Sequence, residues 1–260
     1  MALKSFDLTG TVALLTGGNG GIGLGMAEGL AQAGADIVIW GRDADKNAAA
    51  EAKLKAHGVR IMSRQVDVSV EAEVAAGMTE AVEAMGRLDT VVANAGVSGG
   101  APSFVDYPTE TWRRCMGINL DGVFFTFREA CKHMVARAKA GDPGGSLVAV
   151  SSTAAIHGAA RGEAYSASKS AVNGLVRAVA VEHARYGIRA NAILPGWTIS
   201  EMTGPLQASQ KFNDQVIGRV PSRQWMEPED FAGIAVYLAS KASRLHTGDS
   251  IVIDAGYTIY

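Results

Sequence analysis

Short runs of apolar, mostly β-branched residues alternate along the whole chain with longer segments of helical composition, and this alternation constrains the fold most. Most of the runs are continuously apolar, as expected for strands that helices cover on both faces of a sheet. The predicted strands are residues 12–15, 36–40, 61–66, 90–93, 147–151, 188–194 and 251–253.

The segments between these strands have helical spacing, and they predict helices over residues 22–33, 44–57, 70–85, 110–138, 163–186 and 229–240. A strict strand–helix order implies right-handed crossovers and therefore a doubly wound parallel β-sheet of about seven strands. The exception is the polar, irregular stretch 196–227, which we interpret as a substrate-binding lid or loop with a short helix near 207–217. The sequence thus predicts one α/β domain over residues 1–260.

Composition excludes several classes of function. The net charge is −2 and no basic tract occurs, so neither nucleic acid nor an anionic membrane is an expected partner. No apolar run approaches the roughly 20 residues that span a bilayer, and residues 1–7 lack a secretory hydrophobic segment. Cys115 and Cys131 are far from any C-x-x-C spacing. We therefore expect a cytoplasmic protein.

A glycine-rich block, Thr16-Gly17-Gly18-Asn19-Gly20-Gly21-Ile22-Gly23, follows the first strand and leads directly into a helix. Glycines at this place permit a tight turn and close approach of the backbone to a pyrophosphate, while the helix N-terminus offers free N–H groups. An ordinary flexible turn is the alternative, but the position between strand and helix favours a dinucleotide site. The predicted phosphate-binding residues are Gly17, Asn19, Gly21, Ile22 and Gly23.

The end of the second strand bears on the choice of cofactor. An acidic residue there binds a ribose hydroxyl, whereas an arginine pairs with a 2′-phosphate. This chain has Gly41, which would leave room for the phosphate, followed by Arg42. We therefore favour NADP(H). NAD(H) stays open as the alternative, because Asp43 is acidic at about the generic spacing and Gly20 stands where a second basic residue is often found.

A phenol and an ammonium lie one helical turn apart in Tyr165-Ser166-Ala167-Ser168-Lys169. Free phenol has a pKa of about 10, and a neighbouring cation is expected to lower the pKa of Tyr165 towards neutrality. Ser152 ends the preceding strand, where ligands of parallel sheets bind. Asn119 lies upstream in the long predicted helix.

Taken together, these motifs resemble the short-chain dehydrogenase/reductase family, a group of oxidoreductases with a Rossmann fold, across essentially the whole chain. By this resemblance Tyr165 is the general acid/base, and Ser152 binds the substrate oxygen. Lys169 holds the nicotinamide ribose and lowers the pKa of Tyr165, and Asn119 helps to hold a water molecule. The resemblance also implies that Asp67 and Val68 bind the adenine, that Asn94 and Gly96 lie beside the adenosine ribose, and that Pro195, Gly196 and Thr198 line the nicotinamide.

The function implied is hydride transfer between NAD(P)(H) and a ketone, aldehyde or secondary alcohol. Two alternatives remain: an enoyl reductase or epimerase on the same scaffold, and a non-catalytic nucleotide-binding or regulatory protein. Neither His157 nor His246 has a second ligand at metal spacing, so we expect no metal site. Sugars, 3-oxoacyl thioesters, steroids and cyclic ketones all stay open as substrates. The resemblance also implies a homotetramer.

Overall fold

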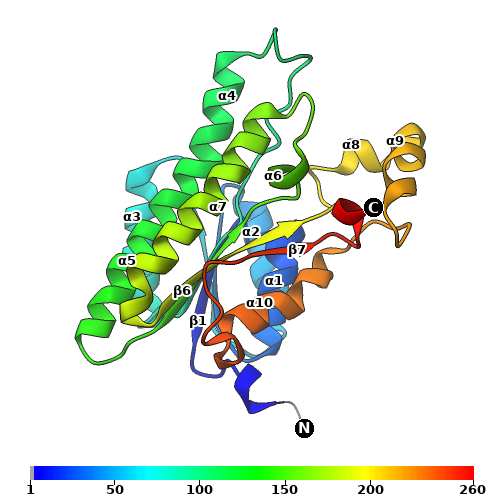
Figure 1. The fold of residues 1–260 in the computed structure, drawn as a ribbon. Coiled ribbons are helices and arrows are strands. Elements are labelled where there is room, and N and C mark those ends of the chain that lie inside the picture. Colours follow the sequence, from blue (N-terminus) through cyan, green and yellow to red (C-terminus); the bar gives the residue numbers. More distant parts are fainter. Residues whose placement is uncertain (1–2) are drawn as a thin grey trace.

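The computed structural model describes residues 3–260 (Figure 1), so the first two residues of the predicted domain lie outside the described residues. Within that range seven strands form one parallel sheet in the order β3-β2-β1-β4-β5-β6-β7. The prediction of a doubly wound parallel α/β sheet is confirmed. The strands are β1 (Val12–Thr16), β2 (Asp36–Gly41), β3 (Ile61–Gln65), β4 (Thr90–Ala93), β5 (Gly145–Val150), β6 (Ile188–Pro195) and β7 (Ser250–Ile253).

Helices cover both faces of this sheet, which explains why the strands are continuously apolar. One face carries α1 (Gly21–Gln32), α2 (Ala44–Lys55) and α10 (Ala232–Ala239). The other carries α3 (Glu71–Met85), α5 (Gly122–Lys139) and α7 (Glu163–His183).

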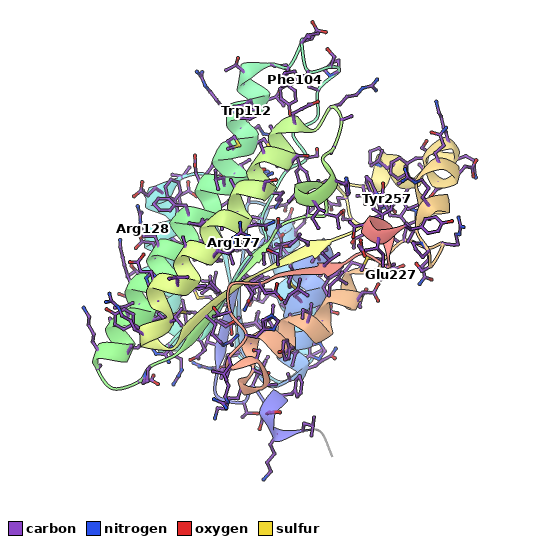
Figure 2. All side chains as sticks on the ribbon, in the orientation of Figure 1. Phe104, Trp112, Arg128, Arg177, Glu227 and Tyr257 are labelled. Atoms are coloured by element: carbon purple, nitrogen blue, oxygen red, sulfur yellow. The ribbon has the colours of Figure 1, made fainter. Side chains whose placement is uncertain are left out.

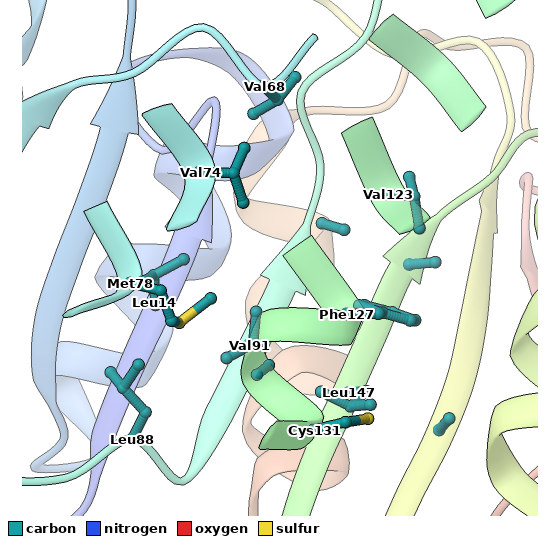
Figure 3. Close-up of a cluster of buried hydrophobic side chains, with 14 of the residues drawn as sticks. Leu14, Val68, Val74, Met78, Leu88, Val91, Val123, Phe127, Cys131 and Leu147 are labelled. Carbon is teal, nitrogen blue, oxygen red and sulfur yellow. The ribbon is translucent and has the colours of Figure 1, made fainter. Parts of the chain in front are cut away.

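Strand β1 shows how one run of residues serves both faces. Val12 and Leu14 belong to the core under α3, α5 and α7 (Figure 3), whereas Ala13 and Leu15 belong to the core under α1 and α10. All four side chains are at most 1% exposed. Every residue of the strand is therefore buried, because successive side chains point to opposite faces.

The strand order reverses between β1 and β4, which are neighbours although β2 and β3 lie between them in sequence. In open parallel sheets, ligands bind at the carboxyl edge beside such a reversal. Thr16 and Ala93 end these two strands and pair with one another, while Val150 and Pro195 end β5 and β6 along the same edge.

Several helices differ from their predicted extents. The helix predicted over 110–138 is divided into α4 (Thr109–Met116), a π-helical turn (Gly117–Asp121) and α5. A short helix α6 (Ala154–His157) follows β5 and was not predicted. Turns of 3₁₀ helix lie at Lys4–Phe6, Ala184–Tyr186, Ile217–Arg219, Pro228–Phe231, Lys241–Ser243 and Tyr257–Ile259.

The predicted lid, residues 196–227, holds two short helices instead of one, α8 (Gly204–Gln207) and α9 (Gln210–Gln215). Its two ends are tied together, because Ile199 N donates to Met226 O (2.8 Å) and Met226 N donates to Trp197 O (2.9 Å). Figure 1 shows α8 and α9 beside the C-terminus, and Figure 2 shows Tyr257 there. The rings of Trp197 and Tyr257 meet edge-on at 6.2 Å, so an aromatic contact seats the lid on the C-terminal segment.

Among residues 3–260, no helix combines the length and the apolarity that crossing a membrane requires.

Candidate active site

Two adjoining cavities, about 320 and 380 Å³ in volume, lie along the carboxyl edge of the sheet. Both are lined by Gly17, Asn19 and Gly96, so they form one continuous cleft. Of the other predicted site residues, those lining the first cavity are Gly21, Ile22, Asn94, Ser152, Tyr165, Lys169, Pro195, Gly196 and Thr198, and those lining the second are Arg42, Asp67 and Val68. Gly23 and Asn119 are the predicted site residues that do not line the cleft.

The glycine-rich block folds into a cradle that suits a phosphate. Gly17 has φ +62° and Gly21 has φ +49°, in the left-handed region that side chains disfavour. A Cβ on Gly23 would overlap the carbonyl of Gly17, so Gly23 acts through packing behind the cradle. Helix α1 begins at Gly21, and no side chain caps its first turn. Its free N–H groups and positive dipole end therefore fit an anion.

Asn94 fastens this cradle to β4. Its Nδ2 donates to Thr16 O and Gly17 O, each at 3.1 Å, and its backbone N donates to Thr16 Oγ1 at 3.0 Å. The side-chain amide is therefore engaged in holding the turn. Asn94 lines the cleft as well, so its packing and its predicted contact with the ribose are compatible.

The expectation that Gly41 leaves free space is wrong. A Cβ built there would lie 2.5 Å from Asn47 Oδ1 and still closer to Asn19 Nδ2. Asn19 Nδ2 donates to Asn47 Oδ1 (2.7 Å), and Asn47 Nδ2 donates to Gly41 O (3.0 Å). The missing side chain thus makes room for an amide pair that holds Asn19 at the cleft.

The charged residues at and beyond the end of β2 differ in how firmly hydrogen bonds and ion pairs hold their side chains. Asp43 caps α2, because its Oδ1 accepts hydrogen bonds from the backbone N of Asp45 and Lys46, each at 3.0 Å. Asp67 Oδ1 accepts from Ser69 Oγ at 2.6 Å. The Arg42 side chain is 60% exposed, and its Nη1 lies 3.8 Å from Asp67 Oδ2. Arg42 is therefore loosely held and available to an anion in the cleft.

Ser152, Tyr165 and Lys169 come together where β5 ends and α7 begins. Lys169 is 3% exposed, and its Nζ donates to Val150 O at 2.7 Å. The same Nζ lies 5.6 Å from the centroid of the Tyr165 ring. Ser152 Oγ accepts from Ala154 N at 3.1 Å, a contact that the first turn after β5 provides. This arrangement puts two hydroxyl groups and one ammonium at the cleft.

The pKa of Tyr165 shifts in the direction opposite to the expected one. Burial raises the pKa of the phenol, and a hydrogen bond with Ser152 opposes that change only in part. Burial also lowers the pKa of Lys169 to about 8. Removal of both side chains from water thus disfavours the phenolate and the ammonium alike.

Asn119 lies in the π-helical turn and is fully buried. Its Oδ1 accepts from Val97 N (2.8 Å), and its Nδ2 donates to Val97 O (2.9 Å) and to Ser168 Oγ (3.2 Å). These contacts use both hydrogens of the amide and one acceptor position of its oxygen. It links the loop after β4 to α7, the helix that carries Tyr165 and Lys169.

Several residues at or behind the cleft were not predicted, among them Lys46, Glu201 and Asn47. Lys46, in the first turn of α2, and Glu201, on the lid, line both cavities, and Asn47 supports Asn19 from behind. The position of Lys46 four residues after Arg42 was a usable signal, whereas Glu201 is remote in sequence from both. Among residues 3–260, no group of three or more His, Cys, Asp or Glu side chains is placed to hold a metal ion.

The fold, the phosphate cradle and the Tyr165–Lys169 pair define a dinucleotide-dependent oxidoreductase. A family profile described as "Enoyl-(Acyl carrier protein) reductase" matches residues 17–258. The 2-dehydro-3-deoxy-D-gluconate 5-dehydrogenase of Dickeya dadantii is 35% identical over 257 residues, which cover 99% of each chain. The chain belongs to the short-chain dehydrogenase/reductase family.

Solved structures agree with this assignment. A gluconate 5-dehydrogenase from Burkholderia cenocepacia, in complex with NADP and tartrate, is 33% identical with a TM-score of 0.93, and the match covers 100% of both chains. An NADPH-dependent 3-quinuclidinone reductase from Rhodotorula rubra is 31% identical with a TM-score of 0.89, covering 98% of this chain and 94% of that one. The prediction of an NAD(P)(H)-dependent oxidoreductase acting on CH–OH and C=O groups is confirmed.

Proposed function

We propose that this protein is an NADP(H)-dependent dehydrogenase/reductase that interconverts a keto sugar acid and the corresponding secondary alcohol. The observation that carries the proposal is the placement of Ser152, Tyr165 and Lys169 beside the glycine cradle at one edge of the sheet. A proton donor, a hydrogen-bond donor and a cation thus face the same cleft as the phosphate site.

A nicotinamide bound along the cleft would supply or accept the hydride. As a carbonyl is reduced, negative charge develops on its oxygen, and Tyr165 donates its hydroxyl proton to that oxygen. Ser152 Oγ donates a hydrogen bond to the same oxygen, which stabilises the developing charge. The hydrogen bond to Val150 O fixes the Lys169 ammonium. Its remaining hydrogens then serve the cofactor ribose and favour the phenolate during alcohol oxidation.

The preference for NADP(H) is supported by the interactions of Asp43 and Arg42, the charged residues that follow β2. Asp43 is occupied as the cap of α2, so it is withdrawn from the ribose contact that would favour NAD(H). Arg42 is free to pair with a 2′-phosphate. The related structure that contains NADP supports the same preference.

The remaining predicted residues take roles along the same cleft. Asp67 and Val68 contact the adenine, Asn94 and Gly96 the adenosine ribose, and Pro195, Gly196 and Thr198 the nicotinamide. Gly17, Asn19, Gly21 and Ile22 surround the phosphates, with Gly23 packed behind them. Asn119 helps to hold a water molecule and also positions the loop after β4. Within a single domain of residues 1–260, the segment 196–227 covers the substrate.

The names of the relatives support a sugar acid as the substrate. A compact cyclic ketone is the second candidate. The related NADPH-dependent 3-quinuclidinone reductase supports this candidate, because the substrate in its name is such a ketone.

A panel of carbonyls and alcohols, followed by nicotinamide absorbance with each of the four cofactor forms, tests this function. We expect 5-keto-D-gluconate to be reduced with NADPH at a higher kcat/KM than cyclic ketones or 3-oxoacyl thioesters. Faster turnover of a cyclic ketone would replace the first candidate by the second. Failure of every substrate with every cofactor would contradict the proposed catalysis.

We also propose a cytoplasmic homotetramer. Cys115 and Cys131 are both buried free thiols, which suits a reducing compartment. Phe124 on α5 is 42% exposed and Val181 on α7 is 83% exposed, so apolar side chains of both helices face outward. Burial of these side chains between copies of the chain would stabilise the assembly.

A further inference from the structure

An ion pair crosses the cleft between the lid and the cofactor half of the protein. Lys46 Nζ lies 2.6 Å from both carboxylate oxygens of Glu201. Among residues 3–260, this is the only ion pair that a residue of the lid makes. Both side chains line both cavities, so the pair lies where the cavities meet.

Lys46 shares the second cavity with Arg42, on the side that leads to Asp67 and Val68. The three carboxylates at this cavity are engaged in different ways. Asp43 caps α2, and Asp67 accepts hydrogen bonds from Ser69. The Glu201 carboxylate has only Lys46 as a hydrogen-bond or ion-pair partner among the described residues, and the side chain is 83% exposed.

A doubly charged phosphate in this cavity would be bound more tightly by two cations than by one, because each supplies a charge-assisted hydrogen bond. Arg42 supplies one. Gly20, where a second basic side chain would be expected, has none, and a Cβ built there would meet no atom within 4 Å. Lys46 is the other ammonium or guanidinium among the described residues that line this cavity.

We propose that Lys46 is the second cation of the 2′-phosphate site and that Glu201 competes with the phosphate for it. This inference rests on the proposed use of NADP(H). Glu201 is well exposed, so it moves into solvent at little cost when the phosphate takes its place. NAD(H) lacks that phosphate and leaves the pair intact, so Lys46 discriminates between the two cofactors.

Isothermal titration calorimetry of NADP+ and NAD+ binding to Lys46→Met tests whether Lys46 is the second cation of the 2′-phosphate site. We expect the Kd for NADP+ to rise about tenfold, the loss of one charge-assisted hydrogen bond, with the Kd for NAD+ unchanged within about twofold. Arg42→Ala is the positive control. Lys55→Met is the matched negative control. Lys55 is on the same helix, its Nζ lies 2.7 Å from Glu51 Oε1, and it lines neither cavity. Equal weakening of both cofactors by Lys46→Met would overturn the assignment.

Glu201→Gln tests the competition. Removal of the carboxylate frees Lys46, so we expect NADP+ to bind two- to fivefold more tightly, the range for an exposed ion pair, while NAD+ is unaffected. If the pair were instead a latch that closes the lid over any dinucleotide, Glu201→Gln would weaken NADP+ and NAD+ alike. That result would overturn the proposal that Glu201 competes with the 2′-phosphate for Lys46.

Two small probes separate this inference from the proposed function. 2′,5′-ADP carries the 2′-phosphate and 5′-AMP does not, so their affinity ratio in the parent protein and in Lys46→Met isolates the contact. An unmutated protein that binds NAD+ more tightly than NADP+ contradicts the proposed cofactor, whatever Lys46 does. If the parent protein prefers NADP+ but Lys46→Met leaves the ratio of 2′,5′-ADP affinity to 5′-AMP affinity unchanged, the role of Lys46 is contradicted and the proposed cofactor is not.

Discussion

Lys169 is buried as completely as many core residues, although it carries an ammonium group. Its pKa falls from 10.5 to about 8 because burial disfavours the charged form. Below pH 8 the folded protein holds a buried cation at a cost of up to about 3 kcal/mol. Between pH 8 and 10.5 the unfolded chain binds this proton and the folded chain does not, so this contribution makes the free energy of unfolding rise with pH.

Lys169→Met should therefore stabilise the cofactor-free protein while it abolishes turnover. We expect a gain of about 1–3 kcal/mol at neutral pH, reduced from the full electrostatic value because Val150 O loses its hydrogen bond. Urea denaturation at neutral pH and near pH 10 measures this change. The gain should shrink at the higher pH. A variant less stable than the parent at neutral pH would show that the Val150 contact outweighs the buried charge.

Tyr165→Phe removes the phenolic oxygen and keeps the ring. Turnover should fall by at least about 10², while NADP+ binding stays within about twofold. Since burial raises the pKa of Tyr165, oxidation of the alcohol by the parent enzyme should speed up with pH into the alkaline range. Retention of most of the activity in the variant would remove Tyr165 from the mechanism. Stopped-flow rates, which isolate the chemical step, are the appropriate measurement.

At the scale of elements, the turn from β1 into α1 allows a matched pair of substitutions. Gly23→Ala puts a methyl group into the carbonyl of Gly17, so it should weaken NADP+ binding at least tenfold or destabilise the fold measurably. Gly20→Ala is the control. Gly20 has an extended backbone with φ −175°, and a Cβ built there meets no atom within 4 Å. The NADP+ affinity and the thermal midpoint of Gly20→Ala should therefore stay near the parent values. Similar effects of both substitutions would mean that packing behind the cradle is unimportant.

If space were free at Gly41, at the end of β2, Gly41→Asp would favour NAD(H) binding; the structure predicts a different result. Gly41→Asp collides with the hydrogen-bonded amides of Asn19 and Asn47. We expect a loss of about 1–3 kcal/mol in stability and weaker binding of both cofactors, measured by chemical denaturation and calorimetry. Tighter NAD+ binding in this variant, without loss of stability, would show that the amide pair rearranges readily.

The strands could be predicted to within about two residues because buried parallel strands are uninterrupted apolar runs, as in β4. Helix α6 could not, since Ala154–His157 is too short to show a periodicity. The π-helical turn at Gly117–Asp121 has no sequence signal of its own within a long helical pattern. The pairing of Lys46 with Glu201 joins residues 155 positions apart and depends on the tertiary fold. Local patterns therefore singled out Tyr165 and Lys169, which both line the cleft, but they could not indicate contacts between distant segments.

For the whole molecule, the proposed assembly can be measured directly. Light scattering after size-exclusion chromatography should give four times the mass of one chain. Val181→Glu puts a charge on a side chain that is 83% exposed in the single chain, and it should reduce the mass to that of a dimer or monomer. Thermal unfolding of the smaller species should depend on protein concentration less than that of the parent. A parent protein that elutes as a monomer contradicts the homotetramer.

The hydrogen bonds that join Met226 to Ile199 and Trp197 at the base of the lid have a consequence for how such enzymes diversify. Thr198 and Met226 lie side by side in an isolated β-bridge, so the intervening residues form a self-contained insert between β6 and α10. Changing the length of a loop with fixed ends costs little, about 0.6 kcal/mol per doubling. The insert is therefore exchangeable: transplanting residues 202–225 from a relative with another substrate, with Glu201 kept, would transfer substrate selectivity and leave hydride chemistry and cofactor choice largely to the resident scaffold.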